Sequence, residues 1–185
     1  EAAIARIEIV DGLAELAATG IVVEAVLEDL DTKQALFVEL EGCVSDDCIL
    51  ASNTSSLMIT DIAAKCARPG RVAGAHFFNP VPLMKLVEVV DGELSERAAG
   101  DTLMALFQRM GHRAVRVKDS PGFLVNHAGR AYSTEALAIL AEGVAGAADV
   151  DRVMHEAAAF PMGPFELFDL TALDVTHRSL ESSFR

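Results

Sequence analysis

Short apolar segments alternate with amphipathic segments along the first two thirds of the chain. The pattern predicts a buried strand at 20–26, a helix with one apolar stripe at 29–44 and a second strand at 49–51. Apolar residues recur with a period near two in strands and near 3.6 in helices, which separates the two kinds of segment. Strands that alternate with helices of this length favour a parallel α/β sheet with right-handed crossovers, the doubly wound class.

The same patterns predict the remaining elements of this layer. They are strands at 7–10, 71–78, 85–90 and 114–118, and helices at 12–18, 55–66 and 95–110. Asp11 is expected to cap helix 12–18, and Gly111 to end helix 95–110. Only the short loop at Asn79-Pro80-Val81-Pro82 separates two of the strands, so we expect strand 85–90 to join the sheet in a non-parallel sense.

The architecture changes at Asp119-Ser120-Pro121-Gly122, a segment rich in turn residues. Beyond it every predicted element is a helix: 124–142, 149–159 and from 165 onward. We therefore predict two domains, an α/β layer at 1–118 and an all-helical domain at 119–185 that begins a bundle without closing it.

The charge balance argues against nucleic acid as a partner. Fifteen Lys and Arg against 28 Asp and Glu give a net charge of −13, which repels phosphate backbones. This charge does not exclude a small phosphorylated ligand, because backbone amides, a helix N-terminus or one Lys can bind it locally. No apolar run approaches the roughly 18 residues that a membrane span needs, so we expect no membrane partner.

Neither a metal site nor a disulfide framework is expected. The three cysteines, Cys43, Cys48 and Cys66, fit no CxxC pattern and no even pairing, which favours a reducing cytoplasm. No Cys, His or carboxylate stands at metal-ligand spacing from four of the histidines, His112, His127, His155 and His177.

Glu88 stands among Leu86, Val87, Val89 and Val90 in an apolar strand, where an unpaired carboxylate is costly. His76 ends the preceding strand, and a sharp turn through the two prolines can bring its imidazole to this carboxylate. A buried carboxylate fixes the tautomer of such a His, which is what a general base requires. Two alternatives stay open: a structural ion pair, or a Glu88 on the solvated face of an edge strand.

Polar residues follow the ends of the predicted strands, where open α/β sheets bind ligands. Ser52-Asn53-Thr54-Ser55-Ser56 comes after one strand, and Glu28 and Lys33 flank the end of another. Ordinary helix capping by a Ser and solvent exposure of the two charges are the alternatives. Asn126, among apolar neighbours, faces either the core or a cleft between the domains, where it would donate to a substrate oxygen.

Four stretches resemble the L-3-hydroxyacyl-CoA dehydrogenase family: SNTSSL at 52–57, AHFFNPVPLMKLVEVV at 75–90, DSPGFLVN at 119–126 and PMGPFEL at 161–167. The resemblance runs over essentially all of the chain. It implies a Rossmann-type NAD-binding domain followed by a helical domain for substrate and dimerisation. It also implies oxidation of an L-3-hydroxyacyl-CoA to the 3-oxoacyl-CoA in β-oxidation or a related pathway, with NAD accepting the hydride.

Carried over residue by residue, the resemblance implies that His76 is the catalytic base and Glu88 its orienting carboxylate. It implies that Ser55 and Asn126 hydrogen-bond the reacting end of the acyl-CoA substrate, with Ser55 close to the nicotinamide. The implied cofactor-binding positions are Val26, Leu27, Glu28, Lys33, Ser55 and Asn79.

The chain departs from the family pattern in two places. No GxGxxG occurs, and His127 stands where the family commonly has Arg. We therefore expect the family's first βαβ unit, roughly 60–90 residues, to precede this chain. A homodimer through the helical domain is expected, and a non-catalytic fragment or assembly module of the same family is the alternative function. A different β-hydroxyacid dehydrogenase with a Lys base is a further alternative, although no Lys stands comparably beside Ser55 and Asn126.

Overall fold

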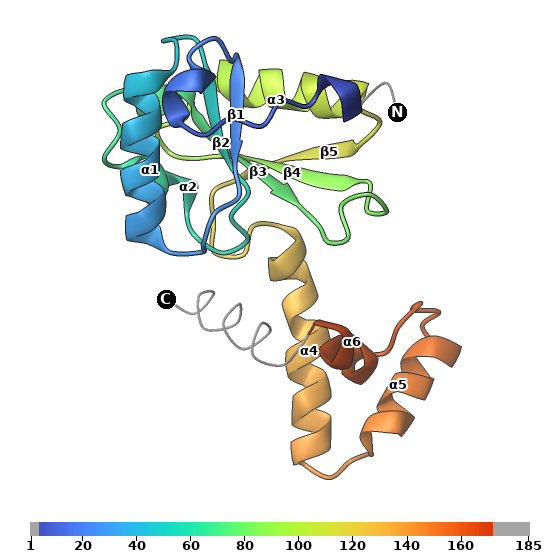
Figure 1. The fold of residues 1–185 in the computed structure, drawn as a ribbon. Coiled ribbons are helices and arrows are strands. Elements are labelled where there is room, and N and C mark those ends of the chain that lie inside the picture. Colours follow the sequence, from blue (N-terminus) through green and yellow to red (C-terminus); the bar gives the residue numbers. More distant parts are fainter. Residues whose placement is uncertain (1–3, 172–185) are drawn as a thin grey trace. The chain divides into compact units, whose positions relative to one another are not determined.

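A five-stranded sheet forms the centre of the first of two units into which the chain divides, Glu1–Asp119 and Ser120–Arg185. The computed structural model describes residues 4–171 (Figure 1). The strands lie in chain order: β1 (Ile21–Glu24), β2 (Ile49–Ser52), β3 (Val72–Phe77), β4 (Leu86–Asp91) and β5 (Arg113–Lys118).

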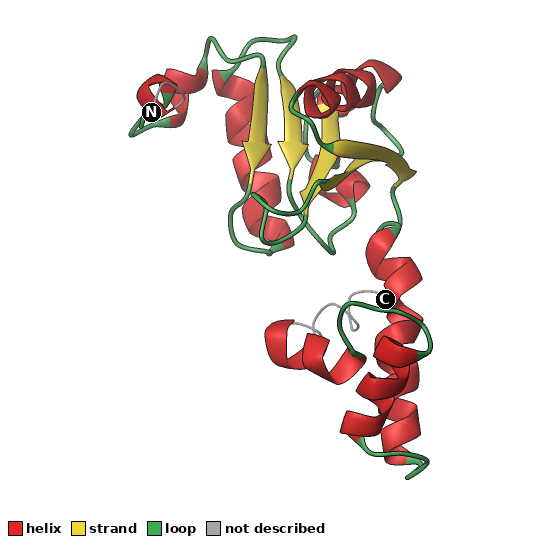
Figure 2. Ribbon diagram, turned by 90° about the vertical axis from the view of Figure 1, so that its right-hand side faces the viewer, coloured by secondary structure: helices red, strands yellow, loops and turns green. Residues whose placement is uncertain are grey.

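The sheet is mixed. β1, β2 and β3 are parallel (Figure 2). β4 is antiparallel to β3, and β5 is parallel to β4. The non-parallel entry of the strand after the proline turn is therefore confirmed. Its physical cause is the short β3–β4 connection, which is too short for the crossover that a parallel strand needs.

Three helices accompany the sheet in this unit: α1 (Leu30–Cys43), α2 (Ile59–Ala63) and α3 (Arg97–Arg109). Asp29 caps α1 by accepting a 2.9 Å hydrogen bond from the Thr32 backbone N–H. Gly111 ends α3 with a φ of +84°, a conformation that costs glycine little. The end at Gly111 is the one that the sequence predicts.

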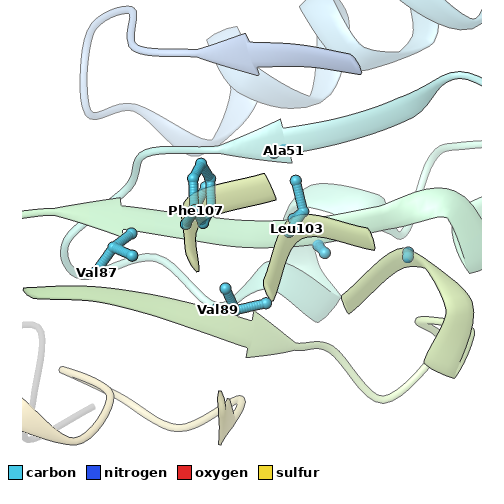
Figure 3. Packing of buried hydrophobic residues seen from close by; sticks show 8 residues of the cluster. Ala51, Val87, Val89, Leu103 and Phe107 are labelled. Atoms are coloured by element: carbon cyan, nitrogen blue, oxygen red, sulfur yellow. The ribbon is translucent and has the colours of Figure 1, made fainter. Parts of the chain in front are cut away.

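Alternate residues of β3 and β4 face different helices, as the pleat of a strand requires. Ala73, Ala75, Val87 and Val89 join Ala51 in a buried cluster with Leu103 and Phe107 of α3 (Figure 3). Between two of them, Gly74 has no room for a side chain. A Cβ there would lie 2.7 Å from the Val90 Cβ and 3.0 Å from Ile59 of α2. Because its neighbours face α3, the residues at even positions of β3 face the side on which α2 lies.

The N-terminal predictions need correction. Residues 7–10 form no strand, because no neighbouring strand pairs with them in the described part of the chain. In place of helix 12–18 there is a 3₁₀ helix, Leu13–Leu16, and the Asp11 N–H donates to the Glu15 carboxylate instead of Asp11 capping it. Two further 3₁₀ turns lie at Ile4–Arg6 and Pro69–Arg71.

Two other predictions need smaller corrections. The predicted helix 55–66 is shorter, because the hydroxyl-rich segment before Ile59 is a loop. Strand β1 is half-exposed rather than buried, since it lies at the edge of the sheet and its Val23 is 44% exposed.

The second unit is helical as predicted, with α4 (Val125–Ala141), α5 (Ala147–Glu156) and α6 (Pro164–Thr171). Phe123, Ala136, Val150 and Phe168 are among its buried apolar side chains. Tyr132 of α4 stacks on Phe160 at 4.9 Å and donates a 2.5 Å hydrogen bond to the Met162 carbonyl. The helix expected from 165 onward corresponds to α6 as far as Thr171, and its continuation, like His177, lies outside the described residues.

Across residues 4–171, every helix is too short or too polar to cross a membrane.

Candidate functional site

β1, β2 and β3 are parallel, so their carboxyl ends lie side by side at one end of the sheet. We call this end the carboxyl edge, or simply the edge. Asn53, in the loop after β2, connects all three ends. Its N–H donates to the Glu24 carbonyl at 2.8 Å, and its Oδ1 accepts the Phe77 N–H at 2.9 Å. The backbone and the side chain of one residue therefore link the three strand ends, which is the place where open α/β sheets bind ligands.

His76 and Glu88 form the first feature of the edge. They are directly opposite each other in the antiparallel β3–β4 register. Their side chains meet with Nδ1 of the imidazole 2.8 Å from Oε2 of the carboxylate, at exposures of 6% and 0%. Because an ionised carboxylate only accepts, Nδ1 donates and Nε2 is the basic nitrogen. The alternative of a Glu88 on a solvated face is wrong, since the carboxylate is fully buried.

The turn after β3 supports the imidazole. The Phe78 ring lies 4.4 Å from the His76 ring, centroid to centroid. Asn79 is exposed and precedes a cis peptide bond to Pro80, whose carbonyl accepts the N–H groups of Leu83 and Met84 at 2.9 and 3.0 Å.

Glu28 forms the second feature, on the β1 and β2 side of the edge. Its Oε1 accepts the Thr54 hydroxyl at 2.5 Å, the Ser55 N–H at 3.0 Å, and the Ser56 N–H and hydroxyl at 3.1 and 3.0 Å. Its Oε2 lies 3.3 Å from the ammonium of Lys33. Burial raises the pKa of this carboxyl, but the Thr54 hydrogen bond, Lys33 and the two serines outweigh burial and lower the pKa overall.

Lys33 is buried at 1% exposure, although it stands in the first turns of α1. Its Nζ lies 2.6 Å from Oε1 of Glu24, which is itself only 4% exposed. The same ammonium lies 3.4 Å from the Val26 carbonyl. The alternative of two solvent-exposed charges is therefore wrong for Lys33.

The other residues named from the sequence are placed as follows. Val26, Leu27 and Ser55 are exposed in the loops after β1 and β2. Asn126 is half-buried in the first turn of α4, in the second unit. The structure thus brings Ser55, Glu28 and Lys33 together on the first unit, while Asn126 is described only within the second.

The capping alternative for the hydroxyl loop is not what the structure has. No serine of this loop caps α2, because the Asp119 carboxylate accepts the N–H groups of Ile59 and Thr60 at 3.0 and 2.7 Å. Thr54 instead closes the loop on itself by accepting the Leu57 N–H at 2.9 Å. The hydroxyls of Thr54 and Ser56 and the backbone N–H groups of Ser55 and Ser56 donate to the Glu28 carboxylate instead.

Sequence reasoning missed Glu24 and the bridging role of Asn53. The signal for Glu24 was present, since it is a carboxylate in the apolar segment 20–26, just as Glu88 is in strand 85–90. No comparable signal existed for Asn53, because its role depends on how three strand ends are spaced.

A second His–Glu pair lies in the helical unit. His155 of α5 places Nε2 at 2.7 Å from Oε2 of Glu166 in α6, and Nδ1 at 3.0 Å from the Phe160 carbonyl. The Glu166 hydrogen bond raises the pKa of His155, and the Gly163 N–H and His155 lower the pKa of Glu166. Among the described residues, no group of three or more side chains is arranged to hold a metal ion.

The chain matches two family models. Residues 1–120 match the NAD-binding domain of 3-hydroxyacyl-CoA dehydrogenase, and residues 122–185 match the C-terminal domain. The chain belongs to the 3-hydroxyacyl-CoA dehydrogenase family. The family resemblance and the Rossmann-type fold with a helical second part, both expected from the sequence, are thus confirmed.

Individual relatives agree with this assignment. A 3-hydroxybutyryl-CoA dehydrogenase from Clostridioides difficile is 45% identical over 155 residues, which are 84% of this chain and 55% of the relative. The mitochondrial hydroxyacyl-coenzyme A dehydrogenase of Homo sapiens is 43% identical over 166 residues, which are 90% and 53% of the two chains. The chain therefore spans about half the length of these curated relatives.

The fold is also similar to solved structures. The crystal structure of (S)-3-hydroxybutyryl-CoA dehydrogenase from Ralstonia eutropha superposes with a TM-score of 0.94 at 38% identity, covering 97% of this chain and 64% of that one.

Proposed function

We propose that this chain carries the hydroxyl-oxidising half of an NAD-dependent L-3-hydroxyacyl-CoA dehydrogenase, with His76 as its general base. The observation that carries the proposal is the buried 2.8 Å contact between His76 Nδ1 and Glu88 Oε2, at the carboxyl edge of the parallel strands. In this proposal residues 1–118 bind the cofactor and residues 119–185 contribute to substrate binding and dimerisation.

The residues at the edge fit a nicotinamide dinucleotide. Glu28 is a carboxylate of lowered pKa whose side chain keeps 37% exposure, so it can accept from sugar hydroxyls. Val26 and Leu27, 46% and 74% exposed, offer apolar surface beside it, and Asn79 and Ser55 supply exposed polar groups. The Lys33 ammonium lies 3.3 Å from the second oxygen of Glu28. Bound NAD supplies the hydride acceptor for C3 of the substrate.

His76 moves the proton. With Nδ1–H donating to Glu88, Nε2 takes the proton of the 3-hydroxyl as the C3 hydride leaves, and it returns that proton in the reverse reaction. Glu88 keeps the imidazole in one tautomer and stabilises the imidazolium that forms. A proton transfer by a positioned side chain contributes about 10²–10⁴-fold to a rate, which sets the size of the expected effect.

Ser55 and Asn126 position the substrate in this proposal. Both offer hydrogen-bonding groups to the oxygens at the reacting end of the acyl-CoA, so that C3 and its hydroxyl are held for transfer. Support comes from Ser55, whose backbone N–H is fixed on Glu28 at 3.0 Å in an exposed loop.

The test is oxidation of NADH by acetoacetyl-CoA, followed by absorbance, on this chain and on a form extended upstream by the βαβ unit that the family resemblance implies. We expect turnover in the extended form, and we expect His76→Asn to reduce kcat by about 10²–10⁴-fold. NADH binding, followed by fluorescence, should change little in His76→Asn, because the imidazole moves a proton and does not hold the cofactor.

The matched control is His155→Asn, which removes the other carboxylate-paired histidine of the described chain. It should leave kcat within about twofold, since a base acts only within hydrogen-bond reach of its proton. A His76→Asn protein with full activity would contradict the proposal. So would an extended form that fails to turn over acetoacetyl-CoA and longer 3-oxoacyl-CoA substrates.

We also propose that the helical unit forms a homodimer and that the protein works in the cytoplasm. The unit exposes several apolar side chains, Leu140, Val144, Val153 and Leu170, at 43–70%. The free thiols of Cys43, Cys48 and Cys66 suit a reducing compartment. Sedimentation across micromolar concentrations should give a dimer, and a strict monomer would contradict the first statement. Cell fractionation tests the second.

A further inference from the structure

Glu24 is a buried carboxylate at the carboxyl edge of the sheet, and none of the roles proposed above uses it. Its Oε1 accepts the Lys33 ammonium and the Val26 N–H, both at 2.6 Å. Its Oε2 accepts the Ser52 hydroxyl, also at 2.6 Å. Both oxygens are therefore engaged with groups from three different segments: α1, the loop after β1, and the end of β2.

The distances rank the two carboxylates that share Lys33. The ammonium lies 2.6 Å from Glu24 and 3.3 Å from Glu28. A buried charge-assisted hydrogen bond is strong at the shorter distance and weaker at the longer one. Glu24 therefore determines where the ammonium lies, and Glu28 is held only loosely by it.

The consequence concerns Glu28. If Glu24 carried no charge, the nearest carboxylate for the buried ammonium of Lys33 would be that of Glu28. A fully paired Glu28 would be drawn toward α1 and would lose acceptor capacity toward an incoming ligand. The N–H of Val26 and the hydroxyl of Ser52 would shift as well, because both are tied to the same carboxylate.

We propose that Glu24 is a positioning residue of the cofactor site, which acts by holding Lys33 away from Glu28 and by fixing the loop that carries Val26. This inference rests on the proposed function, since it assumes that Glu28 faces the cofactor. A merely structural ion pair would stabilise the fold equally well but would not affect cofactor affinity.

The test compares Glu24→Gln with Glu41→Gln. The Gln keeps the shape of the side chain and removes its charge. Glu41 is a matched control on α1, the helix that carries Lys33: its side chain is 10% exposed, accepts the Ala67 and Arg68 N–H groups at 2.7 and 2.9 Å, and lies 3.6 Å from Arg71. Glu41 has no contact with the proposed site.

Two readouts are needed, one of them independent of turnover. Acetylation of amines, mapped by mass spectrometry, compares Lys33 with Lys65, whose side chain is 59% exposed. We expect Lys33 to be protected in the wild type and in Glu41→Gln, and to react faster in Glu24→Gln. In the dehydrogenase assay on the extended form, we expect Glu24→Gln to raise KM for NADH about tenfold with a smaller change in kcat. This is the effect expected from weakening one charge-assisted hydrogen bond.

Each outcome decides the matter. An unchanged KM for NADH in a folded Glu24→Gln protein overturns the positioning role. So does a Lys33 that stays as protected in Glu24→Gln as in the wild type, because Glu24 would then not be what holds the ammonium. An equal rise in KM in Glu41→Gln overturns it too, since loss of stability would then explain both. If Glu24→Gln does not fold, Glu24→Asp and Ser52→Ala replace it. Each keeps the charge, and each should raise KM by about two- to fivefold while kcat stays near that of the wild type. An unchanged KM in both variants overturns the proposal.

Failure of the proposed function is separate and visible in the wild type. A wild-type protein that neither binds NADH nor turns over disproves the function, and this inference falls with it. A wild-type protein that does both, beside a Glu24→Gln protein with the same KM, disproves only the inference.

Discussion

The chain contains two His–Glu pairs with nearly equal contact distances and very different surroundings. His76 and Glu88 meet at 2.8 Å with side chains 6% and 0% exposed, while His155 and Glu166 meet at 2.7 Å with 35% and 51% exposed. The contact distance alone therefore does not tell the two pairs apart. The surroundings decide which pair is suited to proton transfer, because desolvation strengthens the hold of a carboxylate on an imidazole.

The two rings bind their carboxylates through different nitrogens, Nδ1 in His76 and Nε2 in His155. Nδ1 of His155 faces the Phe160 carbonyl while Nε2 faces Glu166, so both nitrogens meet acceptors. Only the doubly protonated imidazolium donates to both. His155 is thus suited to act as a charged clamp between α5 and α6. His76 binds its carboxylate through Nδ1, which suits the exchange of a proton at Nε2.

The largest expected difference between the pairs is in catalysis. Glu88→Gln should lower kcat for acetoacetyl-CoA reduction by about 10²-fold or more, because the amide can donate to Nδ1 and favour the wrong tautomer. Glu166→Gln should leave kcat within about twofold. Steady-state assays of the two variants side by side measure this, and equal effects on kcat would remove the distinction between the pairs.

The next difference is in stability. Glu88→Ala leaves His76 without its buried partner and should cost about 3–5 kcal/mol of the free energy of unfolding. Glu166→Ala should cost less, because its pair is partly solvated. Urea unfolding followed by circular dichroism reports the whole chain. Fluorescence of Tyr132, the only Tyr in a chain without Trp, reports the helical unit. A Glu166→Ala loss as large as that of Glu88→Ala would contradict the argument.

The two pairs also differ in how far the sequence could predict them. His76 and Glu88 could be brought together because strand alternation and a short turn limit their register, and the contact is as expected. Their catalytic roles stay predictions. His155 was considered only as a metal ligand, and its contact with Glu166 was not predicted, because that contact depends on the turn between α5 and α6, where Ala159 has a φ of +55°.

Dependence on neighbouring segments also explains where the other sequence predictions succeeded and failed. Alternation identified the strands β1 to β5 because each has paired neighbours, and it failed at residues 7–10, which have none in the described sheet. Lys33 was taken as a charge that could be solvated, since no local pattern tells a solvated Lys from one buried against a carboxylate nine residues earlier. Buried polar networks are set by packing between segments, which one segment's pattern does not encode.

A third expectation concerns pH. The pKa of His155 is raised above 6.5, so its contribution to stability is full below 6.5 and is lost as the pH rises through the folded-state pKa. The pKa of Glu166 is lowered below 4.5, so its contribution is full above 4.5 and is lost as the pH falls through the folded-state pKa. The pair therefore stabilises the helical unit most between these two values.

Thermal unfolding followed by Tyr132 fluorescence at pH 5.5 and 8.5 tests this window, with Glu166→Gln as the reference. The wild type should lose more stability between the two pH values than the variant does. NMR titration of the His155 ring should give a midpoint above 6.5, and a midpoint at or below 6.5 would contradict the clamp.

The smallest effect is expected from Asp151→Asn. The Asp151 carboxylate accepts the Phe165 and Glu166 N–H groups at 2.9 and 3.2 Å at the start of α6, and its charge also favours the protonated His155. Asn removes the charge and keeps one of the two oxygen acceptors. The pKa of His155 should therefore fall less in Asp151→Asn than in Glu166→Gln, because the hydrogen bond to Glu166 is the main cause of the upward shift. The same NMR titration ranks the two variants. A larger fall of the His155 pKa in Asp151→Asn would mean that the negative charge around α5, rather than the hydrogen bond to Glu166, keeps His155 protonated.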